Sequence, residues 1–160
     1  MLFRSQKARE YNIGVQIYVD EPRAQLGRRS TVNVWVRDQS PDWELTMDLG
    51  NLDLAMLTAF KLQKSCGAEI RLVTAVPEEQ HVEPAEEYLR NLLDLARFPD
   101  VEVRVHNTDF EDALQVVPHA DVELLGLPEQ PDYDFLRMMV DARKSTCLFV
   151  ADSGDENILA

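Results

Sequence analysis

Residues 31–64 read TVNVWVRDQSPDWELTMDLGNLDLAMLTAFKLQK, and this stretch decides the fold. A short apolar strand, residues 32–36, runs into an acidic loop and then into a helix that starts near Gly50. Few polar positions interrupt the apolar surface of that helix: Asp53, Thr58, Lys61 and Gln63. A helix that lies on one sheet in water normally keeps a polar face. We therefore expect this helix to cover the sheet on one side and, on the other, to meet either a partner or the rest of a larger single core.

Strand-like and helical segments alternate after Gly67, a glycine that suits the end of a helix. The expected strands are 70–74, 101–105, 122–127 and 147–150, and the expected helices are 84–96, 109–117 and 131–144. The alternation of apolar and charged residues in 101–105 is typical of an edge strand, whereas 31–37 and 124–127 should be central. Because helical crossovers join parallel strands, we predict an α/β fold with a five-stranded, mainly parallel, doubly wound sheet.

The N-terminal region follows a different pattern. Val15–Val19, with the sequence VQIYV, is expected to form an extra strand, and no helical segment separates it from Thr31. Two successive strands without a crossover helix indicate a hairpin or a strand outside the parallel set. A lone N-terminal strand is also suited to pairing with another chain. We therefore divide the chain into an N-terminal arm, residues 1–30, and an α/β domain, residues 31–160.

The formal net charge of −13 is unevenly distributed, since residues 76–160 hold 6 Lys and Arg against 20 Asp and Glu. Nucleic acid is therefore a poor partner, because binding phosphates requires a clustered positive surface. The basic residues gather near the start: Arg4, Lys7, Arg9, Arg23, Arg28, Arg29 and Arg37. Such a segment could bind an anionic membrane surface or the acidic half of a second copy, or its charges could simply be scattered and solvated.

Targeting and redox features are few. No apolar run approaches the roughly 20 residues that span a bilayer, and the start, MLFRSQKARE, lacks the apolar core of a secretory signal. Cys66 and Cys147 adjoin apolar segments, so we interpret both as buried free thiols in a reducing compartment.

The candidates for catalysis and metal binding are weak. His106 with Asp109, Glu111 and Asp112 forms a possible metal or acid/base cluster, but carboxylates at a helix start are more often caps. Cys147 has no neighbouring base, which argues against a nucleophile. Residues 152–156, DSGDE, resemble an oxygen-rich cation loop but are most simply a polar tail. We predict no catalytic residue, no metal site and no cofactor.

The predicted fold is compatible with a nucleotide site, because doubly wound sheets often bind nucleotides beyond their strand ends. Asp38 and Ser40 follow the first crossover strand and resemble the strand-end Asp-x-Ser of universal stress proteins. The place where those proteins carry a glycine-rich phosphate loop reads GLPEQPDYD here, starting at Gly126. One glycine, two prolines and three acids disfavour a bound phosphate. Asp38, Ser40 and Gly126 remain the candidates for a small-ligand or nucleotide site.

Three stretches resemble the cytoplasmic carboxy-terminal domain of cation–chloride cotransporters, particularly the prokaryotic members of the amino acid–polyamine–organocation permease superfamily. They are GRRSTVNVW (27–35), GNLDLAMLTAFKL (50–62) and EIRLVTAV (69–76), which are similar to that domain's basic segment and strand, its leucine-rich helix and its following strand. Residues 103–112 and 135–150 resemble it more weakly. The chain departs from the family pattern after Trp35, where a second Trp and a Gly-rich loop are replaced by Val36-Arg37-Asp38.

The resemblance implies a universal-stress-protein-like domain that performs no chemistry and lies on the cytoplasmic side of a transporter, tethered to the inner face of the membrane. It would help two copies to associate as a homodimer, contact the membrane domain of the same transporter, and influence transport. The candidate interface residues lie on the extra strand and on the apolar helix: Val15, Ile17, Leu54, Leu57 and Leu62.

Overall fold

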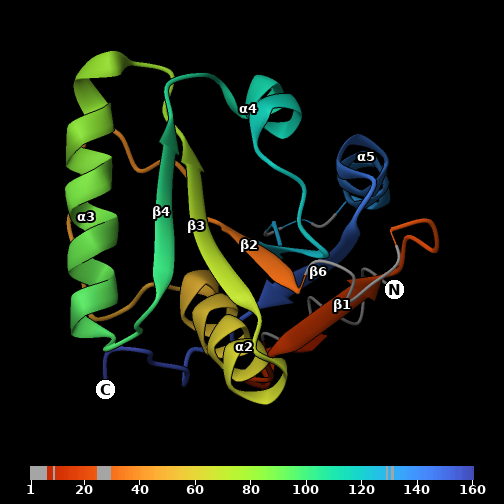
Figure 1. Cartoon of the computed structure of the whole chain (residues 1–160). Coiled ribbons are helices and arrows are strands. Elements are labelled where there is room, and N and C mark those ends of the chain that lie inside the picture. Colours follow the sequence, from red (N-terminus) through yellow and green to blue (C-terminus); the bar gives the residue numbers. More distant parts are fainter. Residues whose placement is uncertain (1–6, 9, 25–29, 129, 131) are drawn as a thin grey trace.

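The computed structural model describes residues 7, 8, 10–24, 30–128, 130 and 132–160 (Figure 1). The strands are β1 (Val15–Val19), β2 (Thr31–Trp35), β3 (Glu69–Ala75), β4 (Val101–His106), β5 (Val122–Gly126) and β6 (Thr146–Ala151). The helices are α2 (Asn51–Cys66), α3 (Val82–Leu95), α4 (Phe110–Val116) and α5 (Tyr133–Arg143), and a short 3-10 turn, η1 (Glu79–His81), precedes α3. Each strand and helix predicted after residue 30 is confirmed, with ends that differ by one or two residues.

The strands form one mixed, mostly parallel sheet in the order β1-β6-β5-β2-β3-β4. β2 and β5 are central and parallel neighbours, and β4 is an edge strand, as the sequence predicts. β1 runs antiparallel to β6, with Ile17 opposite Phe149. β1 is thus the strand outside the parallel set. The alternative of a hairpin is wrong, because β6 and β5 lie between β1 and β2.

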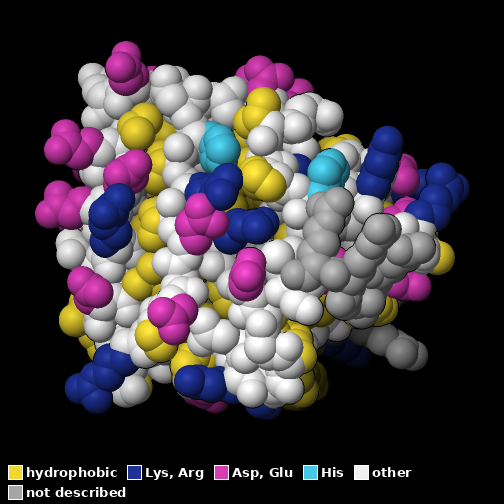
Figure 2. Space-filling view, viewed as in Figure 1, with side chains coloured by type: hydrophobic (Ala, Val, Ile, Leu, Met, Phe, Trp, Pro, Cys, Tyr) yellow, Lys and Arg dark blue, Asp and Glu magenta, His cyan; other side chains and the backbone are white. Residues whose placement is uncertain are grey.

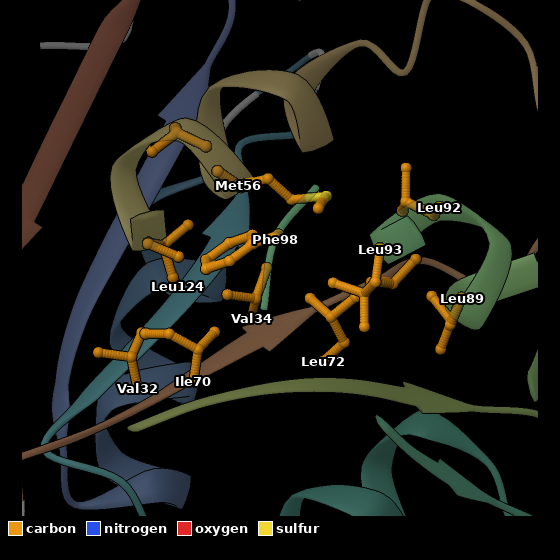
Figure 3. Close-up of a cluster of buried hydrophobic side chains, with 14 of the residues drawn as sticks. Val32, Val34, Met56, Ile70, Leu72, Leu89, Leu92, Leu93, Phe98 and Leu124 are labelled. Atoms are coloured by element: carbon orange, nitrogen blue, oxygen red, sulfur yellow. The ribbon is translucent and has the colours of Figure 1, made fainter. Parts of the chain in front are cut away.

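One face of the sheet packs against α2 and α3 (Figure 1). Alternate strand residues point to this side, and Val34, Leu72 and Leu124 are fully buried there. Met56 of α2 and Leu92 of α3 meet them in one continuous core, which Figure 3 shows in close-up. The period of two along each strand places the intervening residues on the opposite face.

The second face packs against α4 and α5. Trp35, Val73 and Phe149 point to this side and pack with Leu114 of α4 and Met139 of α5. The sheet therefore has helices on both faces, and the predicted doubly wound arrangement is confirmed.

Local sequence signals set the helix ends. Gly67 adopts the left-handed conformation, with φ 67°, and its N–H donates to the Gln63 carbonyl, which ends α2. Asp109 and Asp132 cap α4 and α5, since their side chains accept hydrogen bonds from the N–H groups of Asp112 and Asp134. The predicted Asp cap of the short helix is thereby confirmed.

The residues after β6 form more than a polar tail. Ile158 and Leu159 pack against the core beside α2, and the Ile158 N–H donates to Asp53 Oδ1 at 2.9 Å. Ala55, Met56 and Ala59 face the sheet and are at most 1% exposed. The chain's own end therefore covers part of the apolar helix surface that the sequence leaves without a neighbour.

Candidate functional site

A cleft of about 1170 Å³ opens where the carboxyl ends of β2 and β5 lie side by side. The crossover from β2 leads away on one side and that from β5 on the other, so this is the switch point of the doubly wound sheet. Ligands of such folds bind at this position. The lining comes from the segments after β2, β5 and β6, from the start of α2 and from aromatic side chains: Trp35, Arg37, Asp38, Asn51, Phe110, Gly126, Phe135 and Asp152.

Two of the three predicted ligand residues lie in this cleft. Asp38 and Gly126 both line it, because parallel strands end at the same edge of the sheet. The Asp38 carboxylate is occupied locally: its Oδ1 accepts hydrogen bonds from the Ser40 N–H at 2.9 Å and from the Ser40 hydroxyl at 2.6 Å. Ser40 thus fixes the loop through Asp38 and does not itself line the cleft.

Asn51 fills the space above Gly126. A Cβ atom at position 126 would lie 3.2 Å from the Asn51 Cβ, so glycine permits the close approach. The Asn51 amide donates to the Leu127 carbonyl at 2.8 Å and accepts from the Asp152 N–H at 3.1 Å. One side chain therefore ties the start of α2 to the segments that follow β5 and β6. This role of Asn51 is not predictable from its neighbours in the sequence, although Asn51 stands at the predicted helix start.

The start of α2 is already supplied with negative charge. Asp53 is 1% exposed, and its Oδ2 accepts from the Leu49 N–H at 2.9 Å while its Oδ1 accepts from the Ile158 N–H. A carboxylate in the first turn satisfies backbone N–H groups and uses the positive end of the helix dipole. Burial and the nearby Glu156 carboxylate raise the pKa of Asp152, which also lines the cleft. These acids disfavour a bound phosphate.

The residues considered in the sequence for metal binding or acid/base catalysis do not come together in one site. Asp109 caps α4, and His106 has a buried Nε2 without a hydrogen-bond partner. Burial and the positive charge of Arg104 lower the pKa of His106. Glu156 accepts hydrogen bonds from the N–H and hydroxyl of Ser153, so this carboxylate is bound within the loop. The part of the chain that the structure describes contains no cluster of His, Cys, Asp and Glu suited to a metal.

The two cysteines differ. Cys147 is buried as predicted, and burial together with the nearby Glu123 carboxylate raises the pKa of its thiol to about 12. Cys66 is exposed, so its predicted burial is wrong. Cys66 is the last residue of α2, beyond the turns that the core covers.

A buried ion pair was not predicted. Arg143 and Glu123 are both fully buried, and Arg143 Nη2 lies 2.9 Å from Glu123 Oε1. The Trp35 indole N–H donates to Glu123 Oε2 at 2.6 Å, and the Asn33 amide donates to the same oxygen at 3.2 Å. The remaining Arg143 N–H groups donate to three backbone carbonyls, those of Leu114, Val117 and Pro118. This cluster joins β2, β5, α5 and the end of α4 beneath the cleft.

The predicted interface residues occupy different environments. Ile17 is 7% exposed and belongs to the second core, which Val15 adjoins. Leu54 and Leu62 are half-buried and pack against the first core. Leu57 is half-buried on α2 and belongs to neither core cluster. Leu57 is therefore the predicted interface side chain that its own chain engages least.

Exposed apolar side chains gather around β1. Tyr11, Ile13 and Tyr18 are 72%, 55% and 55% exposed. The Gln16 amide donates to the Thr58 hydroxyl at 3.1 Å, which joins this strand to α2. We call the group formed by Gln16, Tyr18, Leu57 and Thr58 the β1–α2 surface.

Charge is distributed as the composition indicates. Acidic side chains predominate over α3 in the face that Figure 2 shows. Glu83, Glu87 and Asp94 are exposed residues of that helix. The exposed side chains of Lys7, Arg23 and Arg37 belong to the basic segment. Its other members, Arg4, Arg9, Arg28 and Arg29, lie outside the described residues.

The fold and the cleft define a doubly wound α/β domain with a crevice at its switch point. Across the residues that the structure describes, no helix has both the length and the hydropathy of a membrane span. The chain belongs to the family described as prokaryotic cation-chloride cotransporter, C-terminal domain, 2nd, whose sequence profile matches residues 27–159. The resemblance found in the sequence is thereby confirmed, and the family is that of a transporter domain, which is not known as an enzyme.

A solved structure is closely similar. It is the crystal structure of the cytoplasmic domain of a prokaryotic cation chloride cotransporter, with 33% sequence identity and a TM-score of 0.89. The match covers 99% of this chain and 60% of that one, so this chain spans about 60% of the length of its solved relative. No curated protein sequence matches the chain.

Proposed function

We propose that this chain is a non-catalytic regulatory domain that associates as a homodimer and acts on a cation–chloride cotransporter-like membrane domain. It would lie on the cytoplasmic side, tethered to the inner face of the membrane. Family membership supports the link to a transporter. The observation that carries the dimer is the β1–α2 surface, where Tyr18 is 55% exposed.

The β1–α2 surface suits a protein partner better than solvent. Single exposed apolar residues are ordinary, but contiguous ones mark contact sites. Tyr18 and Gln16 lie on one side of β1, and the Gln16–Thr58 hydrogen bond brings α2, which carries Leu57, next to this side. A stable interface buries roughly 800 Å² on each partner. Strand and helix must both contribute to reach that area.

Replacing Leu57 by glutamate should weaken association at least about tenfold, because the interface would have to desolvate a charge. Light scattering over a concentration series, up to hundreds of micromolar, measures the dissociation constant. Leu95→Glu is the matched control, since Leu95 is 60% exposed on α3, away from the β1–α2 surface, and this variant should associate like the unmodified chain. A chain that stays monomeric throughout would overturn the proposed dimer.

The cleft supports a second candidate, a universal-stress-protein-like small-ligand or nucleotide-binding protein. Its position at the switch point and its aromatic lining, Trp35, Phe110 and Phe135, favour a planar ring. Asp38 and Gly126 would lie beside such a ligand, and Ser40 would hold Asp38 in place.

Thermal unfolding with ATP, AMP and cyclic dinucleotides separates the two candidates. A ligand present at about 100 times its dissociation constant stabilises the folded state by about 2.7 kcal/mol. The leading proposal predicts no shift with any of them, since the Asp38 and Asp152 carboxyl groups line the cleft. A shift that Asp38→Ala abolishes, with Asp42→Ala as the control on the same loop, would favour the second candidate.

A further inference from the structure

The outer edge of β1 carries free backbone groups. The Val150 carbonyl accepts from the Leu127 N–H and therefore points toward β5. Successive residues of a strand point alternately to its two sides, so Phe149 and Ala151 point toward β1. Their partners Ile17 and Val15 therefore direct their N–H and C=O groups into hydrogen bonds with β6. The N–H and C=O groups of Gln16 and Tyr18 consequently point away from the sheet, and no described strand pairs with them.

The two edges of the sheet are protected differently. β4, with the sequence VEVRVH, carries Glu102 and Arg104, and charged side chains on an edge strand oppose pairing with another chain. β1, with the sequence VQIYV, has no charge, no proline and no lysine. β1 therefore lacks the charged side chains that protect β4, and its residues Gln16 and Tyr18 belong to the β1–α2 surface.

We propose that β1 pairs antiparallel with β1 of a second copy, so that two six-stranded sheets become one continuous sheet. This rests on the proposed dimer and specifies its geometry. With the two-fold axis at Ile17, Gln16 lies opposite Tyr18 of the second copy, and each such pair exchanges two backbone hydrogen bonds. All five residues of each β1 strand then take part in the pairing.

A second copy suits this edge because the register is self-complementary. Asp20 falls opposite Gly14 of the second copy, which has no side chain, and the Glu156 carboxylate of that copy lies 2.9 Å from where a Cβ atom of Gly14 would be. The Tyr18 ring of each copy covers Gln16 of the other, on the side where Leu57 lies. Edge pairing and the β1–α2 surface thus form one interface.

Amide hydrogen exchange measured by NMR at low and high protein concentration tests the pairing directly. The Gln16 and Tyr18 amides should exchange at least about tenfold more slowly in the dimer, because hydrogen bonds to the second copy protect them. The Ile17 amide is bonded to β6 in either state, so its exchange is the internal reference. If the chain dimerises and the Gln16 and Tyr18 amides stay unprotected, the pairing is overturned while the proposed dimer stands.

Tyr18→Lys provides the matching variant. A lysine on the edge strand should weaken dimerisation at least about tenfold, since an edge lysine opposes strand pairing. Tyr133→Lys is the control, because Tyr133 is 62% exposed on α5, away from this edge. Circular dichroism checks that both variants fold. Equal dimerisation of the two variants would overturn the pairing, and a monomeric unmodified chain would overturn the proposed function with it.

Discussion

Arg143→Met should destabilise the domain by about 3–5 kcal/mol, the largest effect expected of any single substitution described here. The substitution removes a fully buried cation and leaves the Glu123 carboxylate buried without its partner. It also leaves three backbone carbonyls without their donors. Urea denaturation measures the loss as a lower midpoint at an unchanged slope.

Two further variants test that explanation. Arg137→Met is the matched control, because Arg137 lies on the same helix, is 72% exposed and faces Asp141 at 3.8 Å. An exposed pair of this kind contributes little, so its loss should cost less than about 1 kcal/mol. The double variant Arg143→Met, Glu123→Leu should recover part of the lost stability, since no lone charge stays buried. An Arg143→Met variant as stable as Arg137→Met would contradict the assigned role.

Met56→Ala should destabilise the domain by about 2–5 kcal/mol through loss of burial and the cavity left behind. Met56 is fully buried where α2 meets the sheet, in the same core cluster as Val34 and Leu92 (Figure 3). Met47→Ala is the control, because Met47 is 63% exposed in the loop before α2 and should cost less than about 0.5 kcal/mol. Thermal and urea unfolding of both variants measure the difference, and equal stabilities would show that α2 does not anchor the core.

Most of the fold followed from local pattern. Alternation of strand and helical segments after residue 67 predicted parallel strands and crossovers, and segments 31–37 and 124–127 were predicted to be central, as β2 and β5 are. Glycine and aspartate at helix ends act within a few residues, so Gly67 and Asp109 were recognisable from sequence. The place of β1 was left open, because a strand of five residues carries no information about which distant edge it joins.

The candidate site was only partly predictable. Asp38 and Gly126 reach one cleft because the carboxyl ends of parallel strands meet at a common edge. The roles of Asn51 and Asp53 depend on hydrogen bonds to segments 101 and 105 residues away, which no local pattern reveals. The buried Glu123 gave one signal, a lone charge in an apolar strand of a doubly covered sheet, and its partner Arg143 was recognisable only in three dimensions.

The sequence by itself determined the fold class, the order of the elements and the family, since periodicity, capping residues and motif stretches are all read over a few neighbouring positions. The tertiary structure alone decided which apolar surface stays uncovered. The end of the chain packs beside α2 through Ile158 and Leu159, whereas among the described residues β1 is an uncharged edge strand joined to α2 by the Gln16–Thr58 hydrogen bond. Such coverage depends on contacts between residues more than one hundred positions apart, and those contacts exist only once the chain has folded.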